Sequence, residues 1–209
     1  NLNPQVIELH KKLKEIVNSL GGEVILINDD RDYPGEAESY VLLYEFRVGL
    51  EEYLKNANSS MKKLTDIIDF NNANKDIVMP YFGQDIFYNS IESTSYLKYI
   101  WSKYKISKSY KSTKDLIDKY DLDAFIGLTR GPAWKINYDG GDYIAMYNSL
   151  EFSSGGYAAH NGMPHITIPY FEINKFPVGI SIIGDRWTDK TIIGYASAIE
   201  KSRYNLDTQ

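Results

Sequence analysis

The sequence predicts an α/β fold, because segments with helical periodicity alternate with short apolar runs that are typical of buried strands. Residues 4–20 place apolar side chains at helical spacing; Asn3 and Pro4 suit the start of a helix, and two glycines suit its end. The apolar run 23–27 follows at once and indicates a buried strand. A helix that leads directly into a strand is the pattern from which layered α/β folds are built.

The rest of the chain continues this alternation. Further strands are predicted at 124–128, 165–168 and 178–183, and further helices at 36–55, 65–71, 89–111 and 112–120, with a last helix capped by Thr188. Residues 81–84 have the character of a loop. No internal repeat or break in composition marks a linker, so residues 1–209 are predicted to form one domain.

Two of these helices carry specific expectations. Between 89 and 111, one helical face is apolar and the opposite side is polar, which predicts an amphipathic helix; the apolar side chains are Leu97, Ile100, Trp101 and Tyr104. Ser112 and Asp115 resemble a capping box, which predicts that a separate helix begins there. The last helix is expected to present Ile192, Ile193, Ala196 and Ile199 on one face.

Composition and charge exclude several classes of protein. Hydrophobic residues make up 43% and charged residues 24% of the 209 residues, as in ordinary globular domains. The formal net charge of -5 argues against nucleic-acid binding through a basic face, and no apolar run is long enough to span a membrane. The absence of cysteine excludes disulfides, thiolate metal sites and a cysteine nucleophile, and fits a cytoplasmic protein. Because the chain starts at Asn1, any targeting signal upstream is outside this sequence.

Two serine patterns could carry nucleophilic chemistry. Ser-x-x-Lys, which places an amine one helical turn from a hydroxyl, occurs at Ser59/Lys62, Ser60/Lys63, Ser95/Lys98 and Ser102/Lys105. We interpret these pairs as solvated helix faces, because the chain is rich in both residues and has no Lys-Thr-Gly partner. The Ser-Ser-Gly-Gly stretch 153–156 could offer a hydroxyl and oxyanion-binding amides, but no base lies near it in the sequence.

A metal site is not expected. His10 lies on a charged helix face, and His160 and His165 are separated by Gly162 and Pro164, which rules out helical ligand spacing. The Asp-Gly-Gly-Asp stretch 139–142 indicates a turn and lacks the further carboxylates of a calcium loop. Trp134 follows the strand that ends near Leu128, so it could form a pocket wall or cover the core.

Seven segments in order resemble the amidase-signature family. Three of them, LDAFIGLTRGPAW at 122–134, GMPHITIP at 162–169 and FPVGISIIG at 176–184, are similar to the family's C-terminal motifs, and the helix from Thr188 stands where the family has its last long helix. Segments 43–47, 67–71 and 81–84 resemble the branch related to peptide amidases. The chain departs from the pattern at Leu128, where the family usually has Pro, and at 155–156, where relatives often have Ser.

The resemblance implies the C-terminal portion of a three-layer α/β/α fold with a mixed sheet. The parent would be an amidase that hydrolyses small-molecule or peptide amides with a Ser–Ser–Lys set, without cofactor or metal. In the family those catalytic residues precede the region that this chain resembles, so no catalytic residue is assigned here and the fragment alone is expected to be inactive. Tyr81, Gln84 and Trp134 are the residues expected to contact substrate.

Alternatives remain open at this point. The glutamyl-tRNA amidotransferases share the C-terminal motifs in their amide-hydrolysing component, and a non-catalytic binding module could use the crevice at Trp134. A Lys followed by Gly-Gly-Ser-Ser-Gly-Gly upstream of Asn1 would favour the enzyme, whereas a start codon near Asn1 would favour the module. An independent Ser-x-x-Lys hydrolase would be labelled by a β-lactam. A partial sheet would expose an unpaired strand edge, which predicts self-association.

Overall fold

The computed structural model describes residues 3–27, 33–140 and 152–206. The chain divides into two compact units. The sheet unit comprises Asn1–Asp32, Ser109–Trp134 and Ser149–Gln209, and the helical unit comprises Tyr33–Lys108 and Lys135–Asn148. Helices and strands together confirm the predicted α/β class. The expectation of one domain over residues 1–209 stays a prediction.

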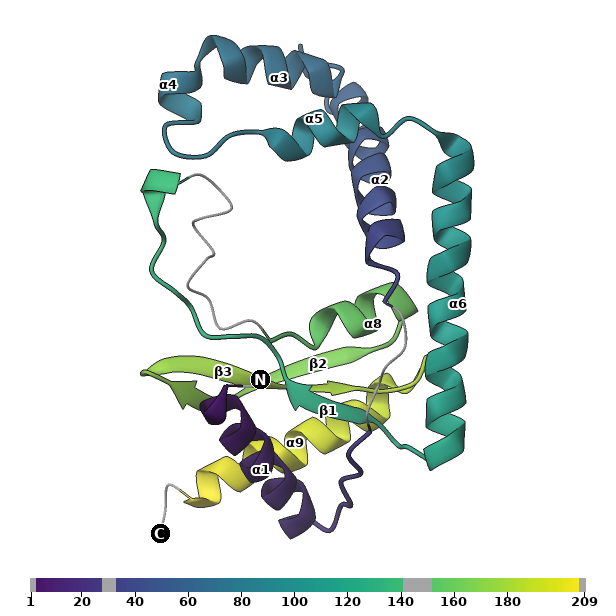
Figure 1. Ribbon diagram of the computed structural model, residues 1–209, viewed down its shortest axis with the longest axis vertical. Helices are drawn as coiled ribbons and strands as arrows, with labels where there is room; N and C mark the ends of the chain where they lie inside the picture. The colour runs from purple at the N-terminus through teal and green to yellow at the C-terminus, as the bar shows by residue number, and fades with distance from the viewer. Residues whose placement is uncertain (1–2, 28–32, 141–151, 207–209) are drawn as a thin grey trace. The chain divides into compact units, whose positions relative to one another are not determined.

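The sheet unit is built on three strands, which lie in the order β1-β3-β2 (Figure 1). They are β1 (Phe125–Leu128), β2 (His165–Ile173) and β3 (Phe176–Ile183). Both pairings with the central β3 are antiparallel, so a mixed sheet would need a parallel pair beyond these three strands. The strands predicted at 124–128, 165–168 and 178–183 are confirmed.

Strand β2 extends past its predicted end at Ile168 and forms a hairpin with β3. Pro169 is tolerated inside it because β2 is an edge strand, where a missing N–H disrupts no ladder on the open side. The pairing register shifts just after Pro169, as in a β-bulge. Asn174 and Lys175 make the connection with φ values of 53° and 69°, as in the two-residue turns that match the twist of a hairpin.

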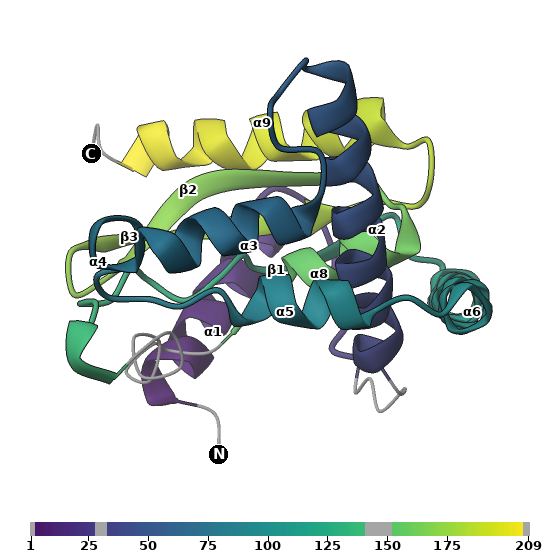
Figure 2. The same cartoon turned by 90° about the horizontal axis from the view of Figure 1, so that it is seen from above.

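Helices α1 (Pro4–Ser19) and α9 (Asp189–Leu206) pack against the same face of the sheet, and Figure 2 shows α9 running beside β2. The core on this face consists of Leu13, Ile168, Ile180, Ile182, Ile192, Ala196 and Ile199. Burial of each large aliphatic side chain contributes about 1.5–3 kcal/mol. On the opposite face, α8 (Gly155–Asn161) packs Ala158 against Ile183 (Figure 1).

Local capping and spacing account for the ends and faces of these helices. As predicted, Asn3 caps α1: its Oδ1 accepts a hydrogen bond from the Gln5 backbone N–H at 2.9 Å. Thr188 precedes α9, but its hydroxyl donates to the Asp185 carbonyl at 2.7 Å. Ile193 is 57% exposed, so the expectation that it shares the apolar face of α9 is wrong. Successive helical residues differ by about 100°, which turns Ile193 away from its neighbour Ile192.

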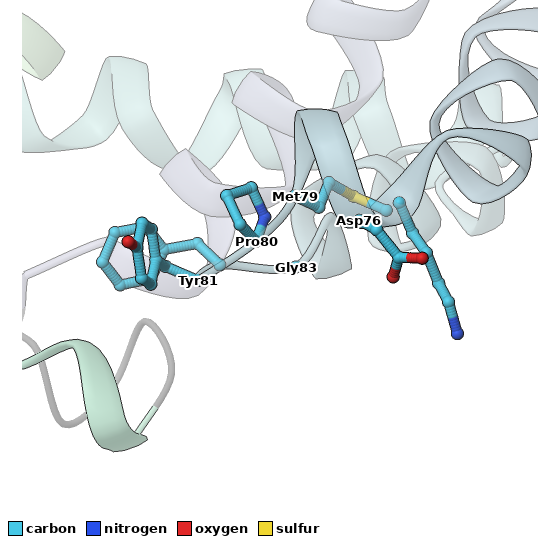
Figure 3. Close-up of a pocket in the computed structure, with 7 residues that line it drawn as sticks. Asp76, Met79, Pro80, Tyr81 and Gly83 are labelled. Carbon is cyan, nitrogen blue, oxygen red and sulfur yellow. The ribbon is translucent and has the colours of Figure 1, made fainter.

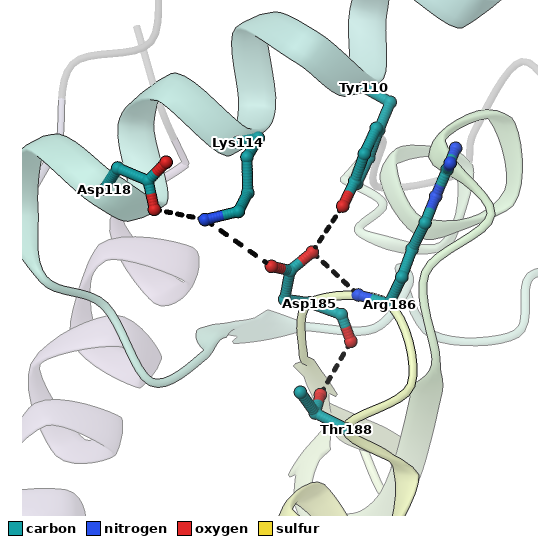
Figure 4. A network of polar contacts seen from close by, with 6 residues as sticks. All are labelled: Tyr110, Lys114, Asp118, Asp185, Arg186 and Thr188. Carbon is teal, nitrogen blue, oxygen red and sulfur yellow. Dashed lines mark hydrogen bonds and ion pairs between the residues drawn. The ribbon is translucent and has the colours of Figure 1, made fainter.

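A polar network connects the C-terminal part of α6 to the turn between β3 and α9 (Figure 4). The Tyr110 hydroxyl donates to Asp185 Oδ1 at 2.8 Å, and Lys114 pairs with both Asp118 and Asp185. Burial and the Asp185 hydrogen bond raise the pKa of Tyr110. The Arg186 guanidinium carbon lies 3.5 Å from the centre of the Tyr110 ring, which adds a cation–π contact.

The helical unit contains short helices packed on one long helix. Its elements are α2 (Gly35–Asn56), α3 (Leu64–Ala73), α4 (Lys75–Val78), α5 (Asp85–Glu92), the N-terminal part of α6 (Tyr96–Tyr120) and the 3-10 turn η1 (Tyr138–Gly140). Tyr40 of α2 holds the start of α6, because its hydroxyl accepts from the Ser95 N–H at 2.9 Å. Among the described helices, none has the length and apolarity needed to cross a bilayer.

Helix α6 corrects two expectations. It runs unbroken from Tyr96 to Tyr120, so no new helix begins at Ser112, whose hydroxyl donates to the Ser109 carbonyl within the helix. The predicted apolar face is also exposed: Leu97 is 82% exposed, whereas the polar Ser102 is only 4% exposed. Periodicity identified the stripe correctly, but which face of a helix is buried depends on where its neighbours lie.

The expectation of a strand at 23–27 is also wrong. These residues have no regular secondary structure, and Leu26 is 96% exposed. An apolar segment becomes a strand only when another strand satisfies its backbone N–H and C=O groups. The three described strands pair with one another and leave 23–27 outside the sheet.

Candidate functional site

The face of the sheet opposite α1 and α9 carries a compact polar cluster. Its members are His165 and Thr167 of β2, Ser181 of β3 and Thr129, which directly follows β1. Thr167 and Ser181 are direct partners in the ladder, and side chains at every second position of a strand share a face. The intervening Ile166, Ile168, Ile180 and Ile182 point to the apolar core.

Short hydrogen bonds connect these side chains across the three strands. Ser181 Oγ donates to Thr129 Oγ1 at 2.8 Å, and His165 Nε2 lies 2.7 Å from Ser181 Oγ. Two longer contacts complete the cluster: Thr129 Oγ1 donates to Thr167 Oγ1 at 3.4 Å, and Thr167 Oγ1 lies 3.3 Å from His165 Nε2. A network of this kind fixes the orientation of its outer groups when its inner members are satisfied.

The cluster is graded from a buried interior to an exposed rim. Ser181 is fully buried, whereas His165 and Thr167 are exposed and Thr129 is intermediate. Burial of part of the imidazole lowers the pKa of His165 below its ordinary value of 6.5. The neutral ring therefore predominates at pH 7, and the cluster offers hydroxyl and N–H donors without a formal charge.

Gly179 leaves a recess between the two threonines. A β-carbon at this position would lie 2.7 Å from Thr167 Cγ2 and 2.8 Å from Thr129 Oγ1, closer than real contacts of this kind. The backbone confirms the close approach, because the Thr129 N–H donates to the Gly179 carbonyl at 2.8 Å. Only glycine fits between these threonines without displacing one of them.

A pocket of about 220 Å³ adjoins this face near β1. Gly127, which is the ladder partner of Ser181, lies in its lining together with Ser153, Ser154 and Tyr157. Ser154 Oγ donates its proton to the Leu128 carbonyl at 2.7 Å. The Ser-Ser-Gly-Gly stretch thus leads into α8 and ties it to β1, and its hydroxyl is bonded to a backbone acceptor instead of a base.

Trp134, one of the residues expected to contact substrate, belongs to the sheet unit. It is half-buried, and the Arg130 guanidinium carbon lies 5.9 Å from the centre of its ring. Such a contact stabilises the ring by about 0.5–1 kcal/mol at an exposed site. Its proposed role as a pocket wall stays a prediction.

Tyr81 lies in the helical unit, in the loop between α4 and α5. It lines an open pocket together with Asp76, Met79 and Pro80 (Figure 3). The ring is 59% exposed, and its centre lies 4.6 Å from that of Tyr138. An exposed ring in this position could contact a ligand, which agrees with the predicted role without testing it.

Gln84 ends the same loop, but its side chain is buried and engaged. Its Oε1 accepts from Asn71 Nδ2 at 2.9 Å, and its Nε2 donates to Asn72 Oδ1 at 2.9 Å. These bonds tie the loop to α3. The structure therefore places Gln84 beneath the loop that carries Tyr81, where it orders the loop; direct contact with substrate stays a prediction.

The other sequence candidates yield no second site. Lys98 lies with its amine 4.3 Å from the centre of the Tyr40 ring, and Ser102 is buried, so neither pair presents an accessible Ser-x-x-Lys dyad. Among the residues that the structure describes, no group of three His, Asp or Glu side chains could hold a metal ion. Half of the predicted 139–142 turn falls outside them. Sequence reasoning missed the Thr129–Ser181 cluster, although alternating polar residues in β2 were a visible signal.

Comparisons with solved structures identify proteins with the same fold. The chain superimposes on a structure named PAM12A with a TM-score of 0.83 and 27% identity, over 94% of this chain and 40% of that one. The native peptide amidase of Stenotrophomonas maltophilia gives a TM-score of 0.78 and 23% identity, over 97% and 42% of the two chains. A bacterial aryl acylamidase of the amidase-signature family gives 0.64 and 16%, over 96% and 40%.

The chain thus spans about two fifths of the length of the solved proteins that it matches. No protein-family model and no curated protein sequence matches it. At these identities the agreement lies chiefly in the order and packing of the elements, and it covers both units of the chain. The expected resemblance is confirmed at the level of the fold.

Proposed function

Because the chain has the fold of the C-terminal portion of amidase-signature proteins, we propose that it is part of an enzyme that hydrolyses carboxamides with a serine nucleophile. The observation that carries this proposal is the match to PAM12A over 94% of the chain at a TM-score of 0.83. The peptide amidase from Stenotrophomonas maltophilia, which has the same fold, makes a small-molecule or peptide amide the substrate class that we favour.

In this proposal the chain supplies sheet strands and pocket walls, and the nucleophile comes from sequence upstream. The state of Ser154 supports this division, because its hydroxyl donates to the Leu128 carbonyl at 2.7 Å and meets no base there. A serine needs an adjacent base or a lowered pKa to attack an amide. The proposed Ser–Ser–Lys chemistry requires neither a metal nor a cofactor.

The first experiment measures ammonia release from a C-terminally amidated dipeptide by the 209-residue chain. We expect no turnover above background. Turnover that disappears in Ser154→Ala but persists in Ser153→Ala would overturn the proposal, because it would place a working nucleophile within this chain. The neighbouring serine is a matched control, since both lie in the same pocket lining.

The second experiment uses a polypeptide that extends upstream of Asn1 through a lysine and a Gly/Ser-rich stretch. We expect it to release ammonia from the same amide, and replacement of the upstream serine by alanine should abolish the release. A longer polypeptide that has those residues and a cooperative unfolding transition but hydrolyses no amide would contradict the proposal. The amidotransferase and non-catalytic alternatives stay predictions, and the latter would then become the stronger.

A further inference from the structure

The direction of the hydrogen bonds in the polar cluster determines which groups face outward. Ser181 has one hydroxyl proton and donates it to Thr129 Oγ1 at 2.8 Å. At its 2.7 Å contact with His165 Nε2, Ser181 must therefore accept, so Nε2 carries the proton. Since Nε2 is a donor, the contact of Thr167 with the same nitrogen cannot use the Thr167 proton.

Two threonine protons are consequently available at the rim of the cluster. The Thr167 hydroxyl proton has no acceptor within the cluster. The Thr129 proton is directed to Thr167 over 3.4 Å, well beyond the usual 2.7–2.8 Å of hydroxyl pairs, so a better acceptor can capture it. Gly179 lies between the two threonines, and its missing side chain leaves room for an incoming atom.

The chemistry of the cluster selects the kind of acceptor. Its four side chains are uncharged when His165 is neutral, and partial burial favours that form by lowering the pKa of the ring. A carboxylate or phosphate is bound best by a charged donor such as arginine. A neutral carbonyl oxygen has two lone pairs and suits two hydroxyl donors that approach from opposite sides.

We infer that Thr129 and Thr167 form a binding site for a neutral carbonyl oxygen, as in a carboxamide or a peptide group, on the open face of the sheet. Ser181 and His165 act as positioning residues that direct the two hydroxyl protons outward. The site deepens the proposed function, on which only the identity of the natural ligand rests. Binding itself requires no nucleophile and can be measured on this chain alone.

The test is a nitrogen-15 NMR titration of the 209-residue chain with N-acetylglycinamide, with acetate as the anionic comparison. We expect saturable shifts of the backbone amides of Thr129, Thr167 and Gly179. The double variant Thr129→Val/Thr167→Val keeps the shape of both side chains and should weaken binding about tenfold, because it removes two neutral hydrogen bonds. Thr191→Val, at an exposed threonine of α9, is the matched control and should bind normally.

Three results would overturn the inference. They are unchanged affinity in the double variant, tighter binding of acetate than of N-acetylglycinamide, and shifts confined to residues outside the cluster. The imidazole nitrogen shifts give a separate readout of the positioning role: we expect His165 in the neutral Nε2–H tautomer. A Nδ1–H tautomer would contradict the hydrogen-bond direction, and Ser181→Ala should alter the tautomer balance while leaving Thr191→Val protein unaffected.

Failure of this site and failure of the proposed function give different results. If the longer polypeptide hydrolyses amides but the double variant changes neither KM nor N-acetylglycinamide affinity, the site is wrong and the function stands. If the chain binds N-acetylglycinamide through the two threonines but no longer polypeptide hydrolyses an amide, the function is wrong and the site stands.

Discussion

Glycine and hydroxyl side chains give the open face of the sheet its character at the scale of single residues. Gly179 keeps Thr129 and Thr167 apart by only the width of a backbone, and the buried Ser181 connects the threonines to His165. The apolar side chains of the same strands point to the other face, where α1 and α9 cover them. Strand alternation therefore separates the stabilising face from the face that can meet a ligand.

Replacement of Gly179 by alanine tests the close packing of the cluster. The new methyl group would lie 2.7 Å from Thr167 Cγ2 and 3.3 Å from the Ile168 carbonyl, so side chains or backbone must shift. We expect a loss of about 1–3 kcal/mol in the free energy of unfolding, measured by urea denaturation. Gly194→Ala in α9 is the control: nothing lies within 4 Å of its β-carbon, so it should stabilise by about 0.5–1 kcal/mol. A neutral Gly179→Ala would contradict the packing.

His165 should make stability depend on pH. Burial lowers its pKa in the folded protein below the ordinary value of 6.5, so the unfolded chain binds the proton first as pH falls. The free energy of unfolding should therefore decrease as pH falls through 6.5 towards the folded-state pKa, and the contribution should be constant above that window. Urea denaturation at about pH 5 and pH 7.5 should show a smaller loss in His165→Gln than in the natural sequence. An equal loss in both proteins would exclude this role for His165.

At the scale of elements, local signals were predictable and tertiary choices were not. The cap at Asn3 and the apolar runs that form β1 and β3 depend on near neighbours in the sequence, and the structure confirms them. The continuous α6 and the unpaired 23–27 depend on which surfaces other elements cover. The same limit explains the site: Thr129 and Thr167 are separated by 38 residues, and only the strand register brings them together.

The β2–β3 hairpin offers a test of backbone conformation. Lys175 occupies the left-handed region with φ of 69°, which costs a residue with a side chain about 1–2 kcal/mol relative to glycine. We expect Lys175→Gly to raise the free energy of unfolding by about 1 kcal/mol in urea denaturation. Lys201→Gly removes the same charge from the interior of α9 and should instead destabilise by about 0.5–1 kcal/mol. Destabilisation by Lys175→Gly would show that the lysine side chain, not the turn, determines stability here.

At the scale of the whole chain, apolar surface is exposed in both units. Leu26 of the sheet unit and Leu97 and Trp101 of the helical unit are examples of large side chains that face solvent. The outer edges of β1 and β2 have no partner strand among the described residues. Exposed apolar patches and unpaired edges both favour association with another polypeptide.

We therefore expect the 209-residue chain to self-associate, with a sedimentation coefficient that rises with protein concentration. Leu97→Lys should reduce association, because it removes an 82% exposed apolar side chain and adds a charge on α6. Ser107→Lys adds the same charge to an exposed α6 position without removing apolar surface, so it should have a smaller effect. Since Leu97 makes little buried contact, its replacement should change the free energy of unfolding by less than about 0.5 kcal/mol. A chain that stays monomeric at all concentrations and unfolds cooperatively would contradict this expectation, and with it the view that these surfaces are covered in a larger protein.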